Sequence, residues 1–185
     1  VYYVWGWVLL AVGAALEWRD HCWLHYEYVH QDQAYFMMGM MVIASVLTLG
    51  LFARPVCPKG PFVRTVGMIA AVAGAIFTAT AVTGVYFDTF MIFANLPFTL
   101  ACLYGLVLLA SAWFVNTAKD ETHQFDIPLS PVLVLTALLL FWALLTTQVY
   151  LFWYCAHEYG EADANWEFRA QMYMSVAWAI YAAAL

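Results

Sequence analysis

Long apolar runs alternate with short polar connections from one end of the chain to the other. Each run approaches the roughly 20 residues that a helix needs to cross the hydrocarbon core of a bilayer. The runs are continuous and about twice as long as a barrel strand requires. The pattern predicts an all-α, polytopic transmembrane helix bundle, one domain over residues 1–185, with about six spans: 1–16, 34–53, 65–84, 96–117, 131–155 and 169–185.

The first apolar run has no polar flank on its N-terminal side, and the last has none on its C-terminal side. The chain starts at Val1 inside an apolar run, without an initiator methionine, and stops at Leu185 inside another. Membrane helices normally carry polar or aromatic anchors at both ends. We therefore expect the first and last spans to be truncated and the chain to be a segment of a longer polypeptide.

Composition supports a lipid-facing exterior. Hydrophobic residues make up 66% of the chain and charged residues 10%, against about 45–50% and 25% in soluble domains. The bilayer is therefore the first expected partner. The net charge of −6 argues against nucleic acid, which requires a basic surface.

Basic and acidic residues fall in different connections. The second and fourth connections contain Arg54, Lys59, Arg64 and Lys119, whereas the first, third and fifth contain only Arg19 and Arg169 among basic residues. The positive-inside rule predicts that 54–64 is cytoplasmic and that the acidic loops 17–33 and 156–168 lie outside. The expected location is a bacterial inner (cytoplasmic) membrane. The acids of these outer connections are Glu17, Asp20, Glu27, Asp32, Asp88, Glu158, Glu161, Asp163 and Glu167.

Small residues recur at helical spacing in the third predicted span. Gly67, Ala71 and Ala75 form one row, with Ala70 and Gly74 beside it. Rows of this kind let membrane helices approach closely. The alternative is that alanine and glycine are simply common in membrane helices, so close packing here is a hypothesis.

Two local signals mark helix starts. Asn95 is a favourable N-cap residue and is followed by Pro97 near the first turn, an arrangement that opens a helix. Pro131 stands at the corresponding place in the fifth apolar run. The sequence therefore predicts helix starts near residues 96 and 131.

Histidines gather in the acidic connections. On a helix, His21 and His25 stand at i and i+4, a spacing that lets two imidazoles reach one metal ion. Asp20 and Glu27 can supply oxygen ligands or orient the rings. The sequence thus predicts a candidate site for copper, zinc or iron on the outer face, with these ligands: His21, His25, His30 and His157.

The same segment has a second interpretation. Trp18, Cys22, Tyr26 and Val29 form an apolar stripe if residues 17–30 are helical. Amphipathic helices of this kind lie in the headgroup region. No H-E-x-x-H or similar metal signature is present, so the interfacial helix is the preferred interpretation and the metal site the alternative.

Cys22 and Cys155 fall on the same predicted side of the membrane. In an oxidising compartment they can form a disulfide between the first connection and the fifth helix. Two separate thiols are an equal alternative, because sequence cannot bring their Cα atoms within bonding distance.

The predicted spans lack Asp, Glu, Lys, Arg and His in their cores. Pumps and ion-coupled transporters place such residues inside the membrane, and a haem held between helices requires axial histidines there. Both classes are disfavoured.

Two stretches resemble a known family. One is 64–114, in which Asn95 follows aromatic residues at a helix start, and the other is 165–182, in which Ser175, Trp178 and Tyr181 share a helix. Both are similar to segments of a family of large bacterial multi-pass membrane proteins of unknown function. The resemblance implies a longer parent protein and supplies no activity and no catalytic residues.

Three functions remain open. We prefer a non-catalytic structural or accessory subunit, or a segment of one, that contacts other membrane chains. The first alternative is a metal-dependent membrane enzyme or redox subunit that uses the outer histidines. The second is a carrier of apolar or lipid-like molecules, for which the adaptable side chains of Met37, Met38, Met40 and Met41 are the sequence feature.

Overall fold

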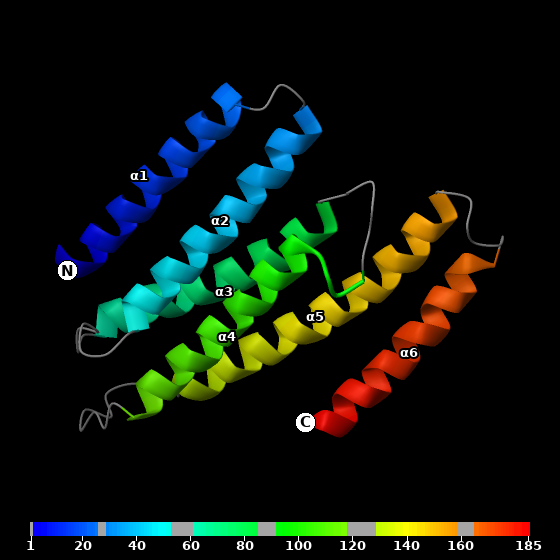
Figure 1. Cartoon of the computed structure of the whole chain (residues 1–185). Helices are drawn as coiled ribbons and strands as arrows, with labels where there is room; N and C mark the ends of the chain where they lie inside the picture. Colours follow the sequence, from blue (N-terminus) through cyan, green and yellow to red (C-terminus); the bar gives the residue numbers. More distant parts are fainter. Residues whose placement is uncertain (1, 26–28, 53–60, 85–91, 118–128, 159–164) are drawn as a thin grey trace.

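The computed structural model describes residues 2–25, 29–52, 61–84, 92–117, 129–158 and 165–185. This part of the chain is helical, as predicted, and has the α-helical bundle arrangement in Figure 1. The six helices are α1 (Tyr2–His25), α2 (Val29–Phe52), α3 (Pro61–Gly84), α4 (Leu96–Thr117), α5 (Leu129–Glu158) and α6 (Trp166–Ala184).

Four helices are long and apolar enough to cross a membrane. Their candidate spans lie in α2, α3, α4 and α5, and the prediction of about six spans is therefore not confirmed. The edge helices α1 and α6 are more polar, because α1 contains Glu17, Arg19 and Asp20 and α6 contains Glu167 and Arg169. The candidate spans are Ala34–Phe52, Thr65–Thr83, Leu96–Asn116 and Leu129–Glu158.

The four apolar helices form the core of the bundle. Helix α4 contacts α2, α3 and α5, while α1 packs on α2 and α6 packs on α5. The two edge helices therefore lie on opposite sides of the bundle (Figure 1). The largest fully buried apolar side chains come from the four apolar helices and include Met41, Leu51, Phe52, Leu108, Leu133 and Leu144.

The row of small residues on α3 faces the core. Gly67, Ala71, Gly74 and Ala75 are all buried. A Cβ atom built at Gly67 would lie 2.8 Å from the ring of Phe52 on α2, closer than real Cβ contacts allow. The hypothesis of close packing on α3 is confirmed, because the side chains of Phe52 and Tyr104 occupy the space beside Gly67 and Gly74.

The stretch that was expected to be an outer loop or an interfacial helix is a continuation of α1. Helix α1 runs to His25 and α2 begins at Val29, so the described residues of 17–33 are helical and not a loop. Trp18 and Cys22 face α2: the Trp18 indole donates a hydrogen bond to the Tyr35 carbonyl oxygen at 3.1 Å, and Cys22 is 1% exposed. Trp18 and Cys22 of the apolar stripe therefore take part in a helix–helix contact, while Tyr26 and the side chain of Val29 lie outside the described part of the chain.

The other connections are also shorter than predicted. Helix α5 continues to Glu158 and α6 begins at Trp166. Most of the described residues within 156–168 are therefore helical. Helix α3 begins at Pro61, within the basic stretch 54–64. The predicted boundaries were placed where the apolar runs give way to charged residues. A helix can continue past such residues.

Both predicted helix starts are close to the observed ones. The Asn95 side chain accepts a hydrogen bond from the Phe98 amide at 2.9 Å, and α4 begins at Leu96. The N-cap prediction is confirmed. Helix α5 begins at Leu129, two residues before Pro131.

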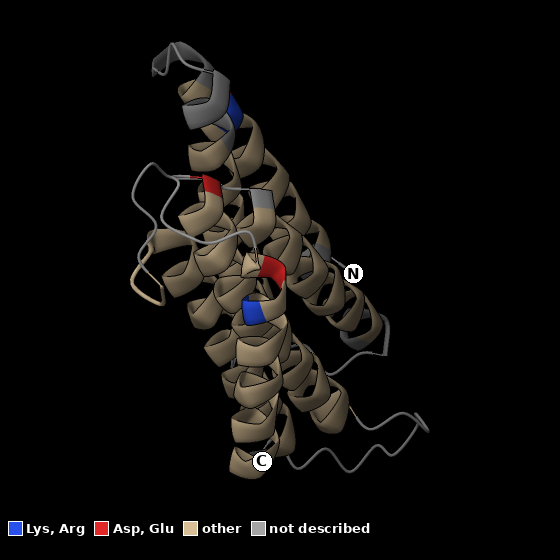
Figure 2. Ribbon diagram, turned by 90° about the vertical axis from the view of Figure 1, so that its right-hand side faces the viewer, with Lys and Arg blue, Asp and Glu red and all other residues tan. Residues whose placement is uncertain are grey.

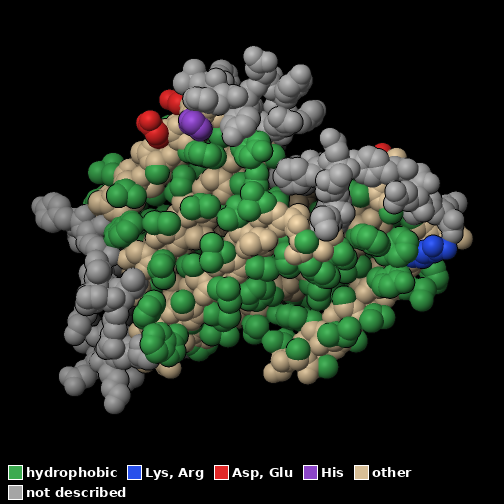
Figure 3. All heavy atoms as spheres, viewed as in Figure 1, with side chains coloured by type: hydrophobic (Ala, Val, Ile, Leu, Met, Phe, Trp, Pro, Cys, Tyr) green, Lys and Arg blue, Asp and Glu red, His purple; other side chains and the backbone are tan. Residues whose placement is uncertain are grey.

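Charged side chains are few and lie near helix ends. Successive helices are antiparallel, so the C-terminal ends of α1, α3 and α5 lie at one end of the bundle (Figure 1). The described helices carry Lys, Arg, Asp and Glu at few positions (Figure 2), and on the face seen in Figure 3 hydrophobic side chains predominate between the ends of the helices. This surface is suited to lipid contact.

Candidate functional site

The structure places the candidate metal ligands on different helices. His21 is exposed near the end of α1 and stacks on Trp18, with ring centroids 5.5 Å apart. His157 lies near the end of α5 and stacks on Trp166 at 5.2 Å. The C-terminal ends of α1 and α5 are well separated in Figure 1, so His157 does not join His21.

The side chains of His25 and His30 lie outside the part of the chain whose side chains are described. Within the described residues, no three His, Cys, Asp or Glu side chains are grouped as a metal site would require. The α-helical backbone of 21–25 keeps the i, i+4 spacing of the first two histidines. Metal binding by His21 and His25 stays a prediction.

Cys22 and Cys155 are both thiols and are not joined by a disulfide. Cys22 lies on α1, which packs on α2, whereas Cys155 lies on α5, which packs on α6. The alternative of two separate thiols is therefore the correct one, because the two residues belong to opposite sides of the bundle.

A tyrosine links three helices in the core. Tyr104 on α4 is fully buried, and its hydroxyl group donates a hydrogen bond to the Ala71 carbonyl oxygen on α3 at 2.9 Å. The hydroxyl oxygen of Tyr104 also lies 3.1 Å from the hydroxyl group of Thr48 on α2. Since the single tyrosine proton goes to Ala71, Thr48 acts as the donor in the second bond. The contact ties α2, α3 and α4 together without a charge.

A second polar link joins α5 to the start of α4. The side-chain oxygen of Gln148, which is fully buried, accepts hydrogen bonds from the Asn95 amide at 2.8 Å and from the Phe93 backbone N–H at 3.2 Å. Phe93 has a φ of 59°, a left-handed conformation that costs about 1–2 kcal/mol outside glycine. We infer that Gln148 helps to hold the chain in this conformation where it enters α4.

Replacing Gln148 with leucine is expected to destabilise the protein by about 1–3 kcal/mol. The substitution keeps most of the volume but leaves the Asn95 amide and the Phe93 N–H without their acceptor. The free energy of unfolding can be measured by titrating the protein from mild detergent into sodium dodecyl sulfate. The matched control is Gln171→Leu at an exposed position on α6, for which a change below about 0.5 kcal/mol is expected; equal losses in both variants would contradict the link.

Three buried polar atoms of the described residues have no hydrogen-bond partner: the Thr78 hydroxyl, the Ser111 hydroxyl and the Gln148 amide nitrogen. All three side chains are fully buried in the apolar core. Together with Ser45, Thr48 and Tyr104 they form the polar content of a core whose described residues include no Asp, Glu, Lys, Arg or His.

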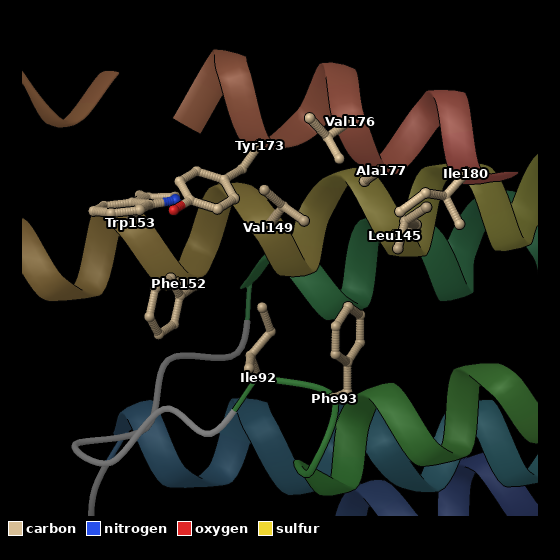
Figure 4. Close-up of a pocket in the computed structure, with 10 residues that line it drawn as sticks. All are labelled: Ile92, Phe93, Leu145, Val149, Phe152, Trp153, Tyr173, Val176, Ala177 and Ile180. Atoms are coloured by element: carbon tan, nitrogen blue, oxygen red, sulfur yellow. The ribbon is translucent and has the colours of Figure 1, made fainter. Parts of the chain in front are cut away.

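A groove of about 680 Å³ lies between α5 and α6. Figure 4 shows side chains of both helices lining it, with Ile92 and Phe93 approaching from the segment that precedes α4. Its walls are almost entirely apolar. The lining residues are Ile92, Phe93, Leu145, Val149, Phe152, Trp153, Tyr173, Val176, Ala177 and Ile180.

Aromatic residues lie at one end of the groove. The rings of Trp153 and Tyr173 have centroids 5.3 Å apart, and the guanidinium group of Arg169 lies 5.8 Å from the Trp153 ring. Glu158 and Glu167 are exposed at the same end of α5 and α6. Trp and Tyr with a nearby charge are typical of the level of lipid headgroups, so the groove runs from this level towards the apolar middle of α5.

This groove was not predicted from the sequence. Its residues belong to two apolar runs and to a connection, and nothing in the sequence states which faces of α5 and α6 meet. The available signal was the density of aromatic residues in 150–154 and 166–178, which indicates an interface but not a cavity.

No protein-family model matches the chain, and no curated protein or solved structure is similar to it.

Proposed function

We propose that the chain is a non-catalytic structural or accessory subunit of a larger membrane assembly. The observation that supports this proposal is the position of α1 at an edge of the bundle, packed on α2. Its outward face carries a row of exposed apolar residues at helical spacing, Trp5, Leu9, Val12 and Leu16. A helix of a partner chain is the proposed occupant of this row, which we call the α1 ridge.

The polarity of α1 favours protein rather than lipid as that occupant. Glu17, Arg19 and Asp20 make α1 less apolar than the four candidate spans. A helix of this kind gains more from protein contacts than a fully apolar one, because charged groups in lipid are costly. Association in a membrane depends on close packing rather than on hydrophobic drive, so the exposed side chains of the α1 ridge supply the contact area.

Leu9→Trp tests the proposal. Added bulk in a packed interface costs about 1–3 kcal/mol, so we expect the fraction of the chain in particles larger than one copy to fall at least about fivefold. Membranes are solubilised in mild detergent, and the protein mass of the particle is measured by size-exclusion chromatography with light scattering. A single chain has a mass of 20.9 kDa.

The control is Ile69→Trp on α3, a residue with similar exposure (61% against 67% for Leu9) on another lipid-facing surface. This variant should keep the particle mass of the wild type. The proposal is wrong if the wild-type chain has the mass of one copy, or if Leu9→Trp and Ile69→Trp change the particle mass equally.

The groove between α5 and α6 favours a second candidate, a carrier of apolar or lipid-like molecules. Small-molecule sites commonly have volumes of about 300–1,000 Å³ and predominantly apolar walls, and this groove has both properties. An enzyme or redox subunit that depends on copper, zinc or iron remains a proposal for the histidines of α1. So do the bacterial inner membrane as location, a cytoplasmic 54–64, and the resemblance to large bacterial multi-pass proteins.

A further inference from the structure

Helix α6 follows α5 through the part of α5 that is long and apolar enough to cross a membrane. The Trp178 indole N–H donates a hydrogen bond to the Thr146 hydroxyl oxygen at 2.9 Å, and the Tyr181 hydroxyl group donates one to the Leu138 carbonyl oxygen at 2.6 Å. Both acceptors lie inside the candidate span Leu129–Glu158. Because α6 lies beside α5 along this stretch (Figure 1), we expect it to share the surroundings of that span.

The polar groups of α6 are arranged for surroundings without water. Its charged residues, Glu167 and Arg169, lie in the first turn. Beyond them, the Ser175 hydroxyl group donates a hydrogen bond to the Gln171 carbonyl oxygen at 2.9 Å, and the two aromatic donors bind α5. In water these groups could bond to solvent, whereas in lipid each of them must find its partner inside the protein. The hydrogen bonds are therefore those that a helix in lipid requires.

The outward face of α6 is apolar beyond its first turn. Met172, Val176 and Ile180 follow one another at intervals of four residues and are 53%, 56% and 65% exposed; we call them the α6 row. No charged residue occurs in Met172–Ala184. Helix α6 has 19 residues, about 28 Å at the rise of an α-helix, and the hydrocarbon core is about 30 Å thick. Its length therefore suffices to cross most of that core.

We propose that α6 crosses the bilayer along α5, with the α6 row in contact with lipid acyl chains. Helix α6 is not among the four candidate spans, because its first residues are polar, and the inference rests on its contacts with α5 rather than on its hydropathy. The charged first turn then lies on the same side of the membrane as Glu158, and the end of α6 lies on the opposite side. The inference is independent of the proposed subunit role, which concerns α1.

The access of water to the α6 row is the first test. Ile180→Cys is compared with Ile76→Cys, a position of similar exposure (65% and 63%) in the candidate span of α3, and with Glu158→Cys at the exposed end of α5. A maleimide reacts with the thiolate, which forms in water. In membrane fragments open on both sides, positions 180 and 76 should react at least tenfold more slowly than position 158. Equal rates at positions 180 and 158 would overturn the proposal.

The sidedness of the two ends of α6 is the second test. Glu158→Cys and Ala184→Cys replace exposed residues, and a membrane-impermeant maleimide is applied to right-side-out or to inside-out vesicles. Mass mapping distinguishes the new cysteines from the native ones. We expect each position to react from one side only, and the two sides to be opposite. If position 184 does not react from the side opposite to position 158, the proposal is wrong even when the α6 row is protected, because α6 would then lie in the membrane without crossing it.

Discussion

Tyr104→Ala is expected to lower the free energy of unfolding by about 3–5 kcal/mol, the cost of removing a large buried aromatic side chain. The side chain is fully buried between α2, α3 and α4, and its loss leaves a cavity at their junction. The cost includes the hydrogen bonds to Ala71 and Thr48. Unfolding in mixed micelles with sodium dodecyl sulfate, followed by circular dichroism, measures the change.

Tyr104→Phe separates packing from hydrogen bonding. It retains the ring and removes the hydroxyl group, so a loss of about 0.6–1.7 kcal/mol is expected from hydrogen bonds inside a membrane protein. Leu103→Ala, at the adjacent exposed position on α4, serves as control and should change stability by less than about 0.5 kcal/mol. If Tyr104→Ala were no worse than Leu103→Ala, the three-helix junction would not be a stabilising element.

The positions of the helices were largely predictable because their signals are local. The fourth helix was predicted at 96–117 and observed at Leu96–Thr117. The Asn95 side chain provides a hydrogen bond to the first turn of this helix, and a cap of this kind depends only on neighbouring residues. The small residues of α3 were also informative, since close approach requires them wherever the partner helix comes from.

The continuation of α1 through residues 17–25 was not predictable from local signals. Charged residues end the apolar run at Leu16, and hydropathy alone therefore ended the span there. The helix continues because Trp18 and Cys22 pack against α2, a tertiary contact between residues that are distant in sequence. A tertiary contact of this kind can override local preference.

The groove could not be predicted from the sequence, because it too depends on tertiary contacts. It exists because α6 contacts α5 and because Phe93, with a φ of 59°, lies beside it. A phenylalanine gives no local signal for a left-handed conformation, which is more usual for glycine or asparagine. The hydrogen bond from its N–H to Gln148 spans two helical segments, so the conformation follows from the fold and not from the neighbouring sequence.

Gly39→Leu is expected to release α1 from α2. Two tryptophans of α1 pack on two glycines of α2: Trp18 contacts Gly39, and Trp7 approaches Gly50, where a built Cβ atom would lie 2.6 Å from the indole. The tryptophans are separated by eleven residues, as are the glycines, about three helical turns in each case. The pairs therefore match in an antiparallel register. Leucine at position 39 overlaps the Trp18 ring and removes this fit.

The thiol of Cys22 reports the release. Cys22 lies one turn after Trp18 and is 1% exposed while α1 is docked, so its rate of alkylation by a maleimide should rise at least tenfold in Gly39→Leu. Mass mapping distinguishes Cys22 from the other cysteines. The control is Gly13→Leu on α1, where a Cβ atom has nothing within 4 Å and the gain in helix propensity is the same, about 1 kcal/mol.

The two substitutions share the chemistry of the added side chain and differ in what that side chain meets. A rise in Cys22 alkylation in Gly39→Leu but not in Gly13→Leu therefore assigns the docking of α1 to the glycine surface of α2. Equal alkylation in both variants would mean that other contacts hold α1. In that case the α1 ridge would keep its place at the edge of the bundle, and Leu9→Trp would still test its role in assembly.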